Sequence, residues 1–348
     1  MKAEKWDKLT RLQFLLSAIV VLRHCDISQS IFPILGKYNG WIGYLLKFIT
    51  DLTNIAVPSF FIISGVLLFR HFSVDMPYYN VWKLNKLSLK KRIKSLVIPF
   101  FIWNALSWLF YALSTHLPGI SSLMNMESVS LKIVNIVYDI IMTKYTPLWF
   151  VRVLFIYVSM SGILFYILRN KYIFMMATSF FVVLQFTDLS IKHYFILWCL
   201  PFFLIGGFIG LHYWNRFSSW KGFDFGKKYF LLSFSIVMIF FYELTALYPF
   251  LYVFCIVSSV LFCTSMIFNN RDIVLYPWYK YSFYIYCTHF IHINIFQKAY
   301  LVIFGKSVLS YVVSWLGVAI LTIAVCCCEA CIIKRYLPKM YGVITGNR

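Results

Sequence analysis

The feature that most constrains this chain is a series of long apolar runs separated by short basic segments. A helix that crosses a membrane needs about 20 mostly apolar residues. Segments that reach or approach this length cover residues 12–27, 45–69, 96–114, 148–168, 172–188, 194–211, 229–244, 246–268, 279–303 and 308–333. We therefore expect an all-α fold, a polytopic membrane helical bundle of about ten transmembrane helices, with residues 1–348 forming one domain.

The composition supports a chain that lies mostly in lipid. Hydrophobic residues make up 61% of it and charged residues only 13%, whereas soluble domains carry about 25% charged residues. The formal charge of +20 would suit nucleic acid, but the Lys and Arg residues sit between apolar runs. Most of them fall on alternate connecting segments, which the positive-inside rule explains if both termini are cytoplasmic. We expect the lipid bilayer as a partner and no nucleic acid; the oligomeric state is not indicated.

The nine cysteines lie in or at the ends of apolar runs. Cys328 and Cys331 form a C-x-x-C, but no second pair has zinc spacing, so we interpret the cysteines as small apolar packing residues and expect no metal. The first apolar run lacks a small-residue cleavage site and is interpreted as an uncleaved span. The stretch 133–146 is short and polar, which favours an interfacial or re-entrant piece.

Three polar residues of the first run share one face of a helix. Helical residues advance by about 100° each, which places Gln13, Ser17 and His24 in a narrow stripe. Gln13 and His24 lie about 16 Å apart at 1.5 Å per residue. His24 is either an idle histidine at the outer interface or part of a stripe facing a wet interior.

A second stripe lies in "KYSFYIYCTHFIHI", residues 280–293, where Ser282, Tyr286 and His289 share a helical face and His292 extends it. Such a stripe either joins helices through hydrogen bonds or lines a cavity together with the first run. Arg152, about one turn inside the fourth run, either extends to the interface or pairs with a phosphate or carboxylate. Glu329 lies at a span end, where a solvated side chain is expected.

The most basic stretch covers residues 70–100, "RHFSVDMPYYNVWKLNKLSLKKRIKSLVIPF". Two interpretations are open. Anionic lipid attracts such segments on the cytoplasmic side. Alternatively, the segment binds a polyanionic nucleotide donor, with Arg92 and Lys94 contacting phosphates.

Several stretches together resemble one family, the membrane acyltransferases of the acyltransferase-3 type. "RLQFLLSAIVVLRH" resembles the first span of that family, "LTNIAVPSFFIISGVLLF" the second and "KKRIKSLVIPFFIW" the basic entry to the third. "TPLWFVRVLFIY", "LPFFLIGGFIG" and "SFYIYCTHFI" resemble later spans, and "LPKMYGVITGNR" resembles the tail of a bacterial branch. The resemblance covers most of the chain in order.

The resemblance implies transfer of an acyl group, usually acetyl, from cytoplasmic acyl-CoA to a hydroxyl of a cell-surface glycan or its lipid-linked precursor. It implies a bacterial cytoplasmic membrane location, a functional histidine at His24, and basic donor contacts at Lys91, Arg92 and Lys94. Two positions depart from the family pattern: Gln13 stands where the family has Arg or Lys, and Val153 follows Arg152 where one branch has Asp.

A mechanism follows as a hypothesis. A thioester needs a base for the attacking hydroxyl and a donor for the developing oxyanion. We predict that His24 is the base, that Gln13 and Ser17 line the path of the pantetheine arm, and that Tyr286, His289 or Arg152 stabilises the oxyanion. A covalent acyl-histidine stays open. The alternatives are a glycan-precursor transporter or flippase, and a non-catalytic family member.

Overall fold

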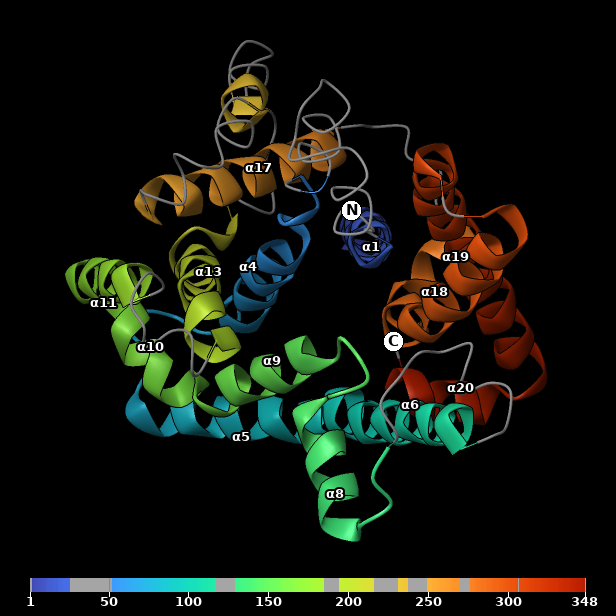
Figure 1. Cartoon of the computed structure of the whole chain (residues 1–348). Coiled ribbons are helices and arrows are strands. Elements are labelled where there is room, and N and C mark those ends of the chain that lie inside the picture. The colour runs from blue at the N-terminus through green and yellow to red at the C-terminus, as the bar shows by residue number, and fades with distance from the viewer. Residues whose placement is uncertain are drawn as a thin grey trace. The chain divides into compact units, whose positions relative to one another are not determined.

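The computed structural model describes residues 2–25, 50, 52–116, 129–184, 194–215, 231–236, 249–269, 276–305 and 307–347. Within these ranges the ordered elements are helices and there is no strand (Figure 1), which confirms the all-α class. The chain divides into two compact units. Unit 1 comprises Met1–Leu16, Lys47–Arg92 and Val153–Tyr279, and unit 2 comprises Ser17–Leu46, Ile93–Arg152 and Lys280–Arg348.

Unit 1 is built around a close crossing of two apolar helices. Its helices are α4 (Ala56–Phe69), α5 (Tyr78–Arg92), α10 (Ser161–Arg169), α11 (Lys171–Leu184), α13 (Tyr194–His212) and α17 (Pro249–Asn269), together with most of α1 (Lys2–His24) and α9 (Trp149–Ser159). Small residues let helix backbones approach closely in membranes. Gly206 and Gly210 of α13 do so here. A Cβ on Gly210 would lie 2.5 Å from the Val66 carbonyl oxygen, and one on Gly206 would collide with the Ile62 carbonyl.

The run predicted as one span over 148–168 is broken in the middle. α9 and α10 meet at Met160 with a bend of 68°. Three of the residues at the break, Ser159, Ser161 and Gly162, are weaker helix formers, and kinks gather at Ser and Gly. Ser161 donates a hydrogen bond to the Asn85 side chain at 2.9 Å instead of remaining within its own helix. The break therefore anchors α10 to α5.

Unit 2 contains a pair of long helices and several shorter helical elements. Its elements are η1 (Ile93–Val97), α6 (Ile98–His116), α8 (Ile133–Met142), α18 (Ser282–Phe304), α19 (Val308–Tyr336) and α20 (Pro338–Thr345), with the last turns of α1; the 3₁₀ helix η2 (Pro277–Tyr281) leads into α18. α18 and α19 pack along each other. On α19, Tyr311, Trp315 and Val318 are buried. The opposite stripe is exposed and apolar, with Leu309, Val313, Leu316 and Ile320.

A π-turn lies at the junction of α5 and α6. The helix runs from Tyr78 to His116, and Ile93–Val97 adopt the wider π geometry. π-turns are rare and often lie at functional sites. The C-terminal segment covers this turn: Gly346 has φ +66°, and a Cβ on it would lie 2.5 Å from the Ser95 Cα. The Trp103 indole N–H donates to the Ile344 carbonyl at 2.9 Å.

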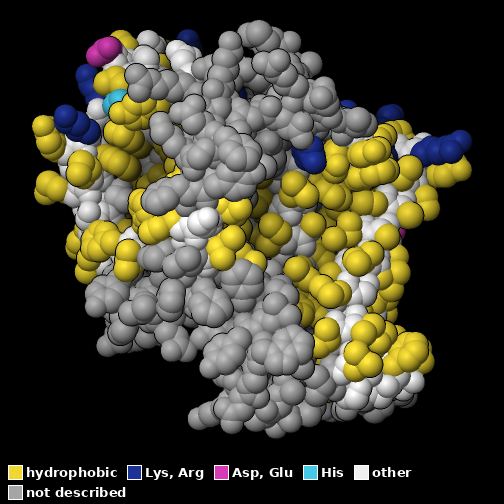
Figure 2. Space-filling model, turned by 90° about the horizontal axis from the view of Figure 1, so that it is seen from above, with side chains coloured by type: hydrophobic (Ala, Val, Ile, Leu, Met, Phe, Trp, Pro, Cys, Tyr) yellow, Lys and Arg dark blue, Asp and Glu magenta, His cyan; other side chains and the backbone are white. Residues whose placement is uncertain are grey.

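Two described helices are long and apolar enough to cross a membrane, Tyr78–His116 and Leu309–Tyr336, and the bent pair α9–α10 would make a third. The number of ten spans and the cytoplasmic termini stay predictions, and most of the predicted span 229–244 lies outside the described residues. Figure 2 shows a described surface dominated by apolar side chains. On α8, the apolar side chains of Ile133 and Val134 are 75% and 74% exposed. This exposure suits contact with lipid rather than water.

Candidate active site

The end of α1 is fixed by hydrogen bonds from two other helices. The last carbonyls of a helix have no partner within it, and in lipid they must find one in the protein. The Trp315 indole N–H donates to the Leu22 carbonyl at 2.9 Å, and the Gln297 amide donates to the Cys25 carbonyl at 2.7 Å. Trp315 lies on α19 and Gln297 on α18. His24, between these two carbonyls, is therefore held at a defined place.

The structure brings the two histidine stripes of the sequence together. The ring centroids of His24 and His289 lie 5.2 Å apart, with 47° between the ring planes. The His24 ring also stands edge-on to Phe290 at 5.5 Å. His24 is partly buried and His289 is fully buried. We refer to His24 and His289 as the histidine pair.

The hydrogen bonds of His289 define its chemistry. Its Nδ1 lies 3.0 Å from the Ile285 carbonyl oxygen and 2.8 Å from that of Tyr286. Carbonyl oxygens only accept, so Nδ1 carries the proton and Nε2 of the neutral ring is an acceptor. Nε2 is buried and has no hydrogen-bond partner among the residues that the structure describes. Leaving a buried polar atom unpaired costs about 1–3 kcal/mol, and such an atom in a native structure calls for a functional explanation.

Tyr286 and Arg152, also in unit 2, are engaged with backbone carbonyls. The Tyr286 hydroxyl donates to the Pro147 carbonyl at 2.6 Å, and its ring centroid is 5.9 Å from that of His289. Arg152 Nη1 donates to the Ile141 carbonyl of α8 at 2.8 Å, a favourable place for a cation because it is a helix C-terminus. The hydrogen bonds of Arg152 thus go to α8, and not to the histidine pair.

The predicted donor residues fall on two helices. Gln13 is partly buried on α1, whereas the Ser17 hydroxyl donates to the Ser282 carbonyl at 3.2 Å and so joins α1 to the start of α18. Lys91 is exposed and Arg92 partly buried at the end of α5, and Lys94 is exposed in the π-turn.

Arg70 and His71 begin the basic stretch 70–100, but they were not predicted from the sequence as donor contacts. Burial and then the positive charge of Arg92 lower the pKa of Arg70. Burial, Arg70 and Lys91 lower the pKa of His71. These effects indicate that the basic side chains at the end of α4 lie close to those at the end of α5. Such a gathering raises the local concentration of anions. We refer to Arg70, His71, Lys91 and Arg92 as the basic cluster.

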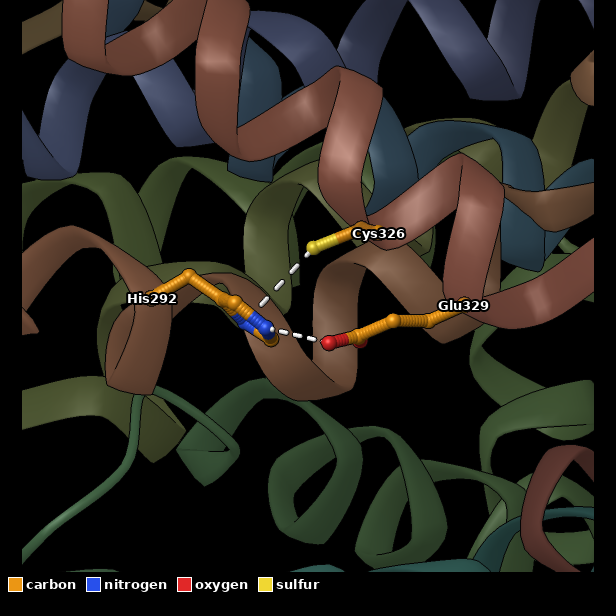
Figure 3. Close-up of side chains that lie close together, drawn as sticks. All are labelled: His292, Cys326 and Glu329. Atoms are coloured by element: carbon orange, nitrogen blue, oxygen red, sulfur yellow. Dashed lines mark hydrogen bonds and ion pairs between the residues drawn. The ribbon is translucent and has the colours of Figure 1, made fainter. Parts of the chain in front are cut away.

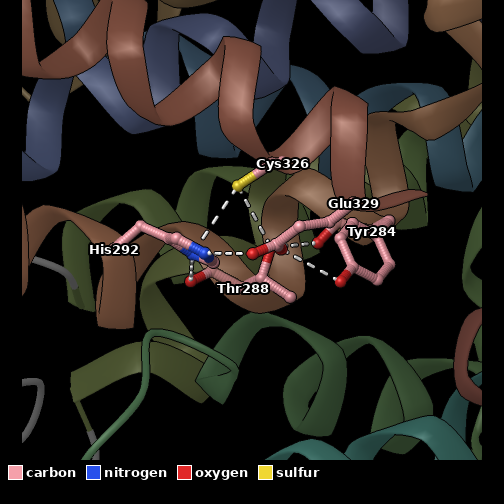
Figure 4. A network of polar contacts seen from close by, with 5 residues as sticks. All are labelled: Tyr284, Thr288, His292, Cys326 and Glu329. Atoms are coloured by element: carbon pink, nitrogen blue, oxygen red, sulfur yellow. Dashed lines mark hydrogen bonds and ion pairs between the residues drawn. The ribbon is translucent and has the colours of Figure 1, made fainter. Parts of the chain in front are cut away.

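A second polar group of unit 2 was also missed. Glu329 of α19 is not a solvated span-end carboxylate as expected. Its Oε1 lies 2.8 Å from His292 Nε2, and its Oε2 accepts a hydrogen bond from the Tyr284 hydroxyl at 3.1 Å. Cys326 and Thr288 complete this network (Figure 4). The residues are three or four apart on α18 and on α19, a spacing that puts them on one face of each helix.

The histidine pair lies on α1 and α18 of a strongly apolar chain. The chain belongs to the Acyl_transf_3 family: the family model, described as an acyltransferase domain, matches residues 7–330. This confirms the resemblance seen in the sequence.

One curated relative gives a partial match. The chain is similar to the "Succinoglycan biosynthesis protein ExoH" of Rhizobium meliloti (strain 1021), with 32% identity over 105 residues. The match covers 30% of this chain and 26% of that protein, so it spans about a quarter of the relative's length. No solved structure matches the chain.

Proposed function

We propose that the protein is a membrane O-acyltransferase that moves an acyl group, acetyl in the first instance, from acyl-CoA to a hydroxyl of a cell-surface glycan or its lipid-linked precursor. The family match over residues 7–330 supports acyl transfer. The name of the relative, which refers to succinoglycan biosynthesis, supports a glycan acceptor. The observation that carries the proposal is the histidine pair with its open, buried Nε2.

The two imidazoles have different roles: His24 is the base, and His289 accepts a hydrogen bond. The acceptor hydroxyl attacks the thioester carbonyl, and His24 takes the hydroxyl proton. The carbon–sulfur bond then breaks, and the CoA thiolate leaves and takes that proton from the His24 imidazolium. His289 cannot donate from Nε2 while its Nδ1–H is bound to carbonyls of its own helix. In this proposal His289 Nε2 instead accepts a hydrogen bond from the imidazolium that forms on His24.

The oxyanion that forms on the thioester carbonyl needs a hydrogen-bond donor. Tyr286 is the nearest candidate by its ring distance to His289, but its proton is bound to the Pro147 carbonyl. In this proposal the Tyr286 hydroxyl turns from Pro147 to the oxyanion when the substrates bind, since catalytic hydrogen bonds often form only in the complex. Arg152, bound at the end of α8, is the second candidate.

The donor is bound through its phosphates and its pantetheine arm. The basic cluster, together with Lys94 in the next helical turn, supplies positive charge for the phosphates. Burial first, and then that neighbouring charge, lowers the pKa of Arg70 and of His71. The stripe of Gln13, Ser17 and His24 extends for about 16 Å along α1, a length that suits the arm. Gln13 is uncharged, so we expect Gln13→Arg to retain or strengthen donor binding.

The test is acyl transfer by the purified, reconstituted protein. Labelled acetyl-CoA and a detergent-solubilised glycolipid acceptor should give a labelled ester. His24→Ala at equal abundance should lower the rate by about 10²–10⁴-fold, the range of general base catalysis. His116→Ala is the matched control, because His116 ends α6 and its ring contacts the Val129 carbonyl at 3.1 Å. Full activity in His24→Ala would refute the base assignment, and glycolipid movement across liposomes without ester would favour a transporter.

A further inference from the structure

We propose that His292, Cys326 and Glu329 form a binding site for Zn²⁺ between α18 and α19. Figure 3 shows the three side chains converging from the two helices. One ligand atom from each lies within 4.8 Å of the others. His292 Nε2 and Glu329 Oε1 are 2.8 Å apart, and Cys326 Sγ is 3.8 Å from His292 Nδ1.

The ligand types and spacing suit zinc. Imidazole nitrogen, thiolate sulfur and carboxylate oxygen are its ligands, at about 2.0–2.3 Å. Around a tetrahedral ion these bond lengths put ligand atoms about 3.3–3.6 Å apart. The nitrogen–oxygen pair, 2.8 Å apart, would open by about half an ångström. The sulfur lies within 4.8 Å of the other two ligand atoms and would close by no more than about 1.3 Å. Three protein ligands leave the fourth position free for water.

The contacts around the cluster are those that orient metal ligands. His292 Nδ1 lies 3.0 Å from the Thr288 carbonyl oxygen, which leaves Nε2 to face the ion. The Thr288 hydroxyl contacts Cys326 Sγ at 3.3 Å. The Tyr284 hydroxyl holds Glu329 Oε2 at 3.1 Å. Partners of this kind fix the tautomer of a ligating histidine and the direction of a ligating carboxylate. Each of the three ligands therefore has its own positioning contact.

The charge balance also favours a divalent ion. Without metal, both ring nitrogens of His292 face oxygen atoms that accept hydrogen bonds, so the ring needs both protons beside the Glu329 carboxylate. On binding, Zn²⁺ replaces the Nε2 proton and the Cys326 thiol proton, and both protons pass to solvent. The complex of Zn²⁺, thiolate and carboxylate has no net charge, which limits the cost of burial. The Glu329 side chain is 36% exposed and leaves an entry route.

Spacing along the sequence conceals this site. The C-x-x-C pair, Cys328 and Cys331, is exposed and lies outside the cluster. The ligands come from two helices, with Cys326 and Glu329 three residues apart on α19. A motif search along one segment therefore misses them. The site uses no residue of the histidine pair, so the zinc proposal can be tested independently of the proposed acyl transfer.

The experiment is a zinc titration of the full chain, purified, stripped with a chelator and reconstituted in nanodiscs. Competition with a chromophoric chelator should give one Zn²⁺ per chain. Cys326→Ser and Glu329→Gln should each weaken binding at least about tenfold, and Tyr284→Phe by about tenfold, as positioning contacts do. Cys328→Ser, an exposed cysteine of the same helix, should bind as the unsubstituted chain does.

A spectroscopic measurement covers the case in which a variant does not fold. Co²⁺ in the unsubstituted chain should give a thiolate-to-metal charge-transfer band, and Cys326→Ser should lack it. Absence of that band in the unsubstituted chain, or zinc binding that Cys326→Ser leaves unchanged, would overturn the proposal.

Discussion

The two units of this protein solve the problem of joining helices in lipid in different ways. In unit 1, α4 and α13 meet through glycines so closely that backbone lies against backbone. In unit 2, side-chain hydrogen bonds to helix carbonyls hold α1 against α18 and α19. The first arrangement leaves no room for substrates at the crossing. The second places polar groups inside an apolar fold, and polar groups at membrane depth are generally functional.

This comparison predicts its largest effect at the glycine crossing. Gly206→Leu forces a side chain into the Ile62 backbone of unit 1, and overpacking of a rigid contact destabilises strongly. We expect nearly all folded protein to be lost, as measured by size-exclusion chromatography after extraction. Gly317→Leu is the control, because a Cβ there meets nothing within 4 Å. Equal yields of the two variants would refute the close backbone contact between α4 and α13.

A smaller but more specific effect is predicted at the histidine pair. His289→Ala should lower the acyl-transfer rate by about 100-fold, within the range of proton-transfer catalysis, without loss of folded protein. His289→Gln should regain part of that loss, because its amide oxygen can accept a hydrogen bond where Nε2 does. The measurement is turnover at saturating donor. If His289→Gln were no better than His289→Ala, the acceptor role of Nε2 would be wrong.

The contacts that fix the end of α1 should have a moderate effect. Trp315→Phe removes the donor to the Leu22 carbonyl, a hydrogen bond of about 1 kcal/mol, and should lower turnover roughly fivefold while the KM for the donor stays unchanged. Trp108→Phe is a matched control, since the buried Trp108 Nε1 has no hydrogen-bond partner in the described part of the chain. An unchanged rate in Trp315→Phe would mean that His24 does not need this contact.

The smallest effect concerns pH and the basic cluster. Burial, Arg70 and Lys91 lower the pKa of His71, and Arg70 Nε donates to His71 Nε2 at 3.2 Å. The folded chain therefore takes up this proton less readily than the unfolded chain. His71 disfavours the folded state only as the pH falls below about 6.5, the ordinary value for histidine. NMR of labelled histidine should show a midpoint below that value, and Lys91→Gln should raise it. An unshifted midpoint would contradict the gathering of charge.

Part of this picture could be predicted from residue patterns and part could not. The helical first run and the stripe of Gln13, Ser17 and His24 follow from periodicity alone. That His24 and His289 meet depends on how two distant helices pack, and only their shared residue type hinted at it. The partners of Arg152 and Glu329 were not predictable, because a carbonyl of α8 and a histidine of α18 carry no local signal. The break at Met160 was missed because apolar character continues across it.

The fit of Gly346 against Ser95 has a practical consequence for anyone handling this protein. Gly346 lies directly on the wide helical turn that carries Lys94. A purification handle or fluorescent fusion joined immediately after residue 348 starts three positions from Gly346. Kinetic work on donor recognition is therefore better done with the handle at the other terminus, or removed by a protease before measurement.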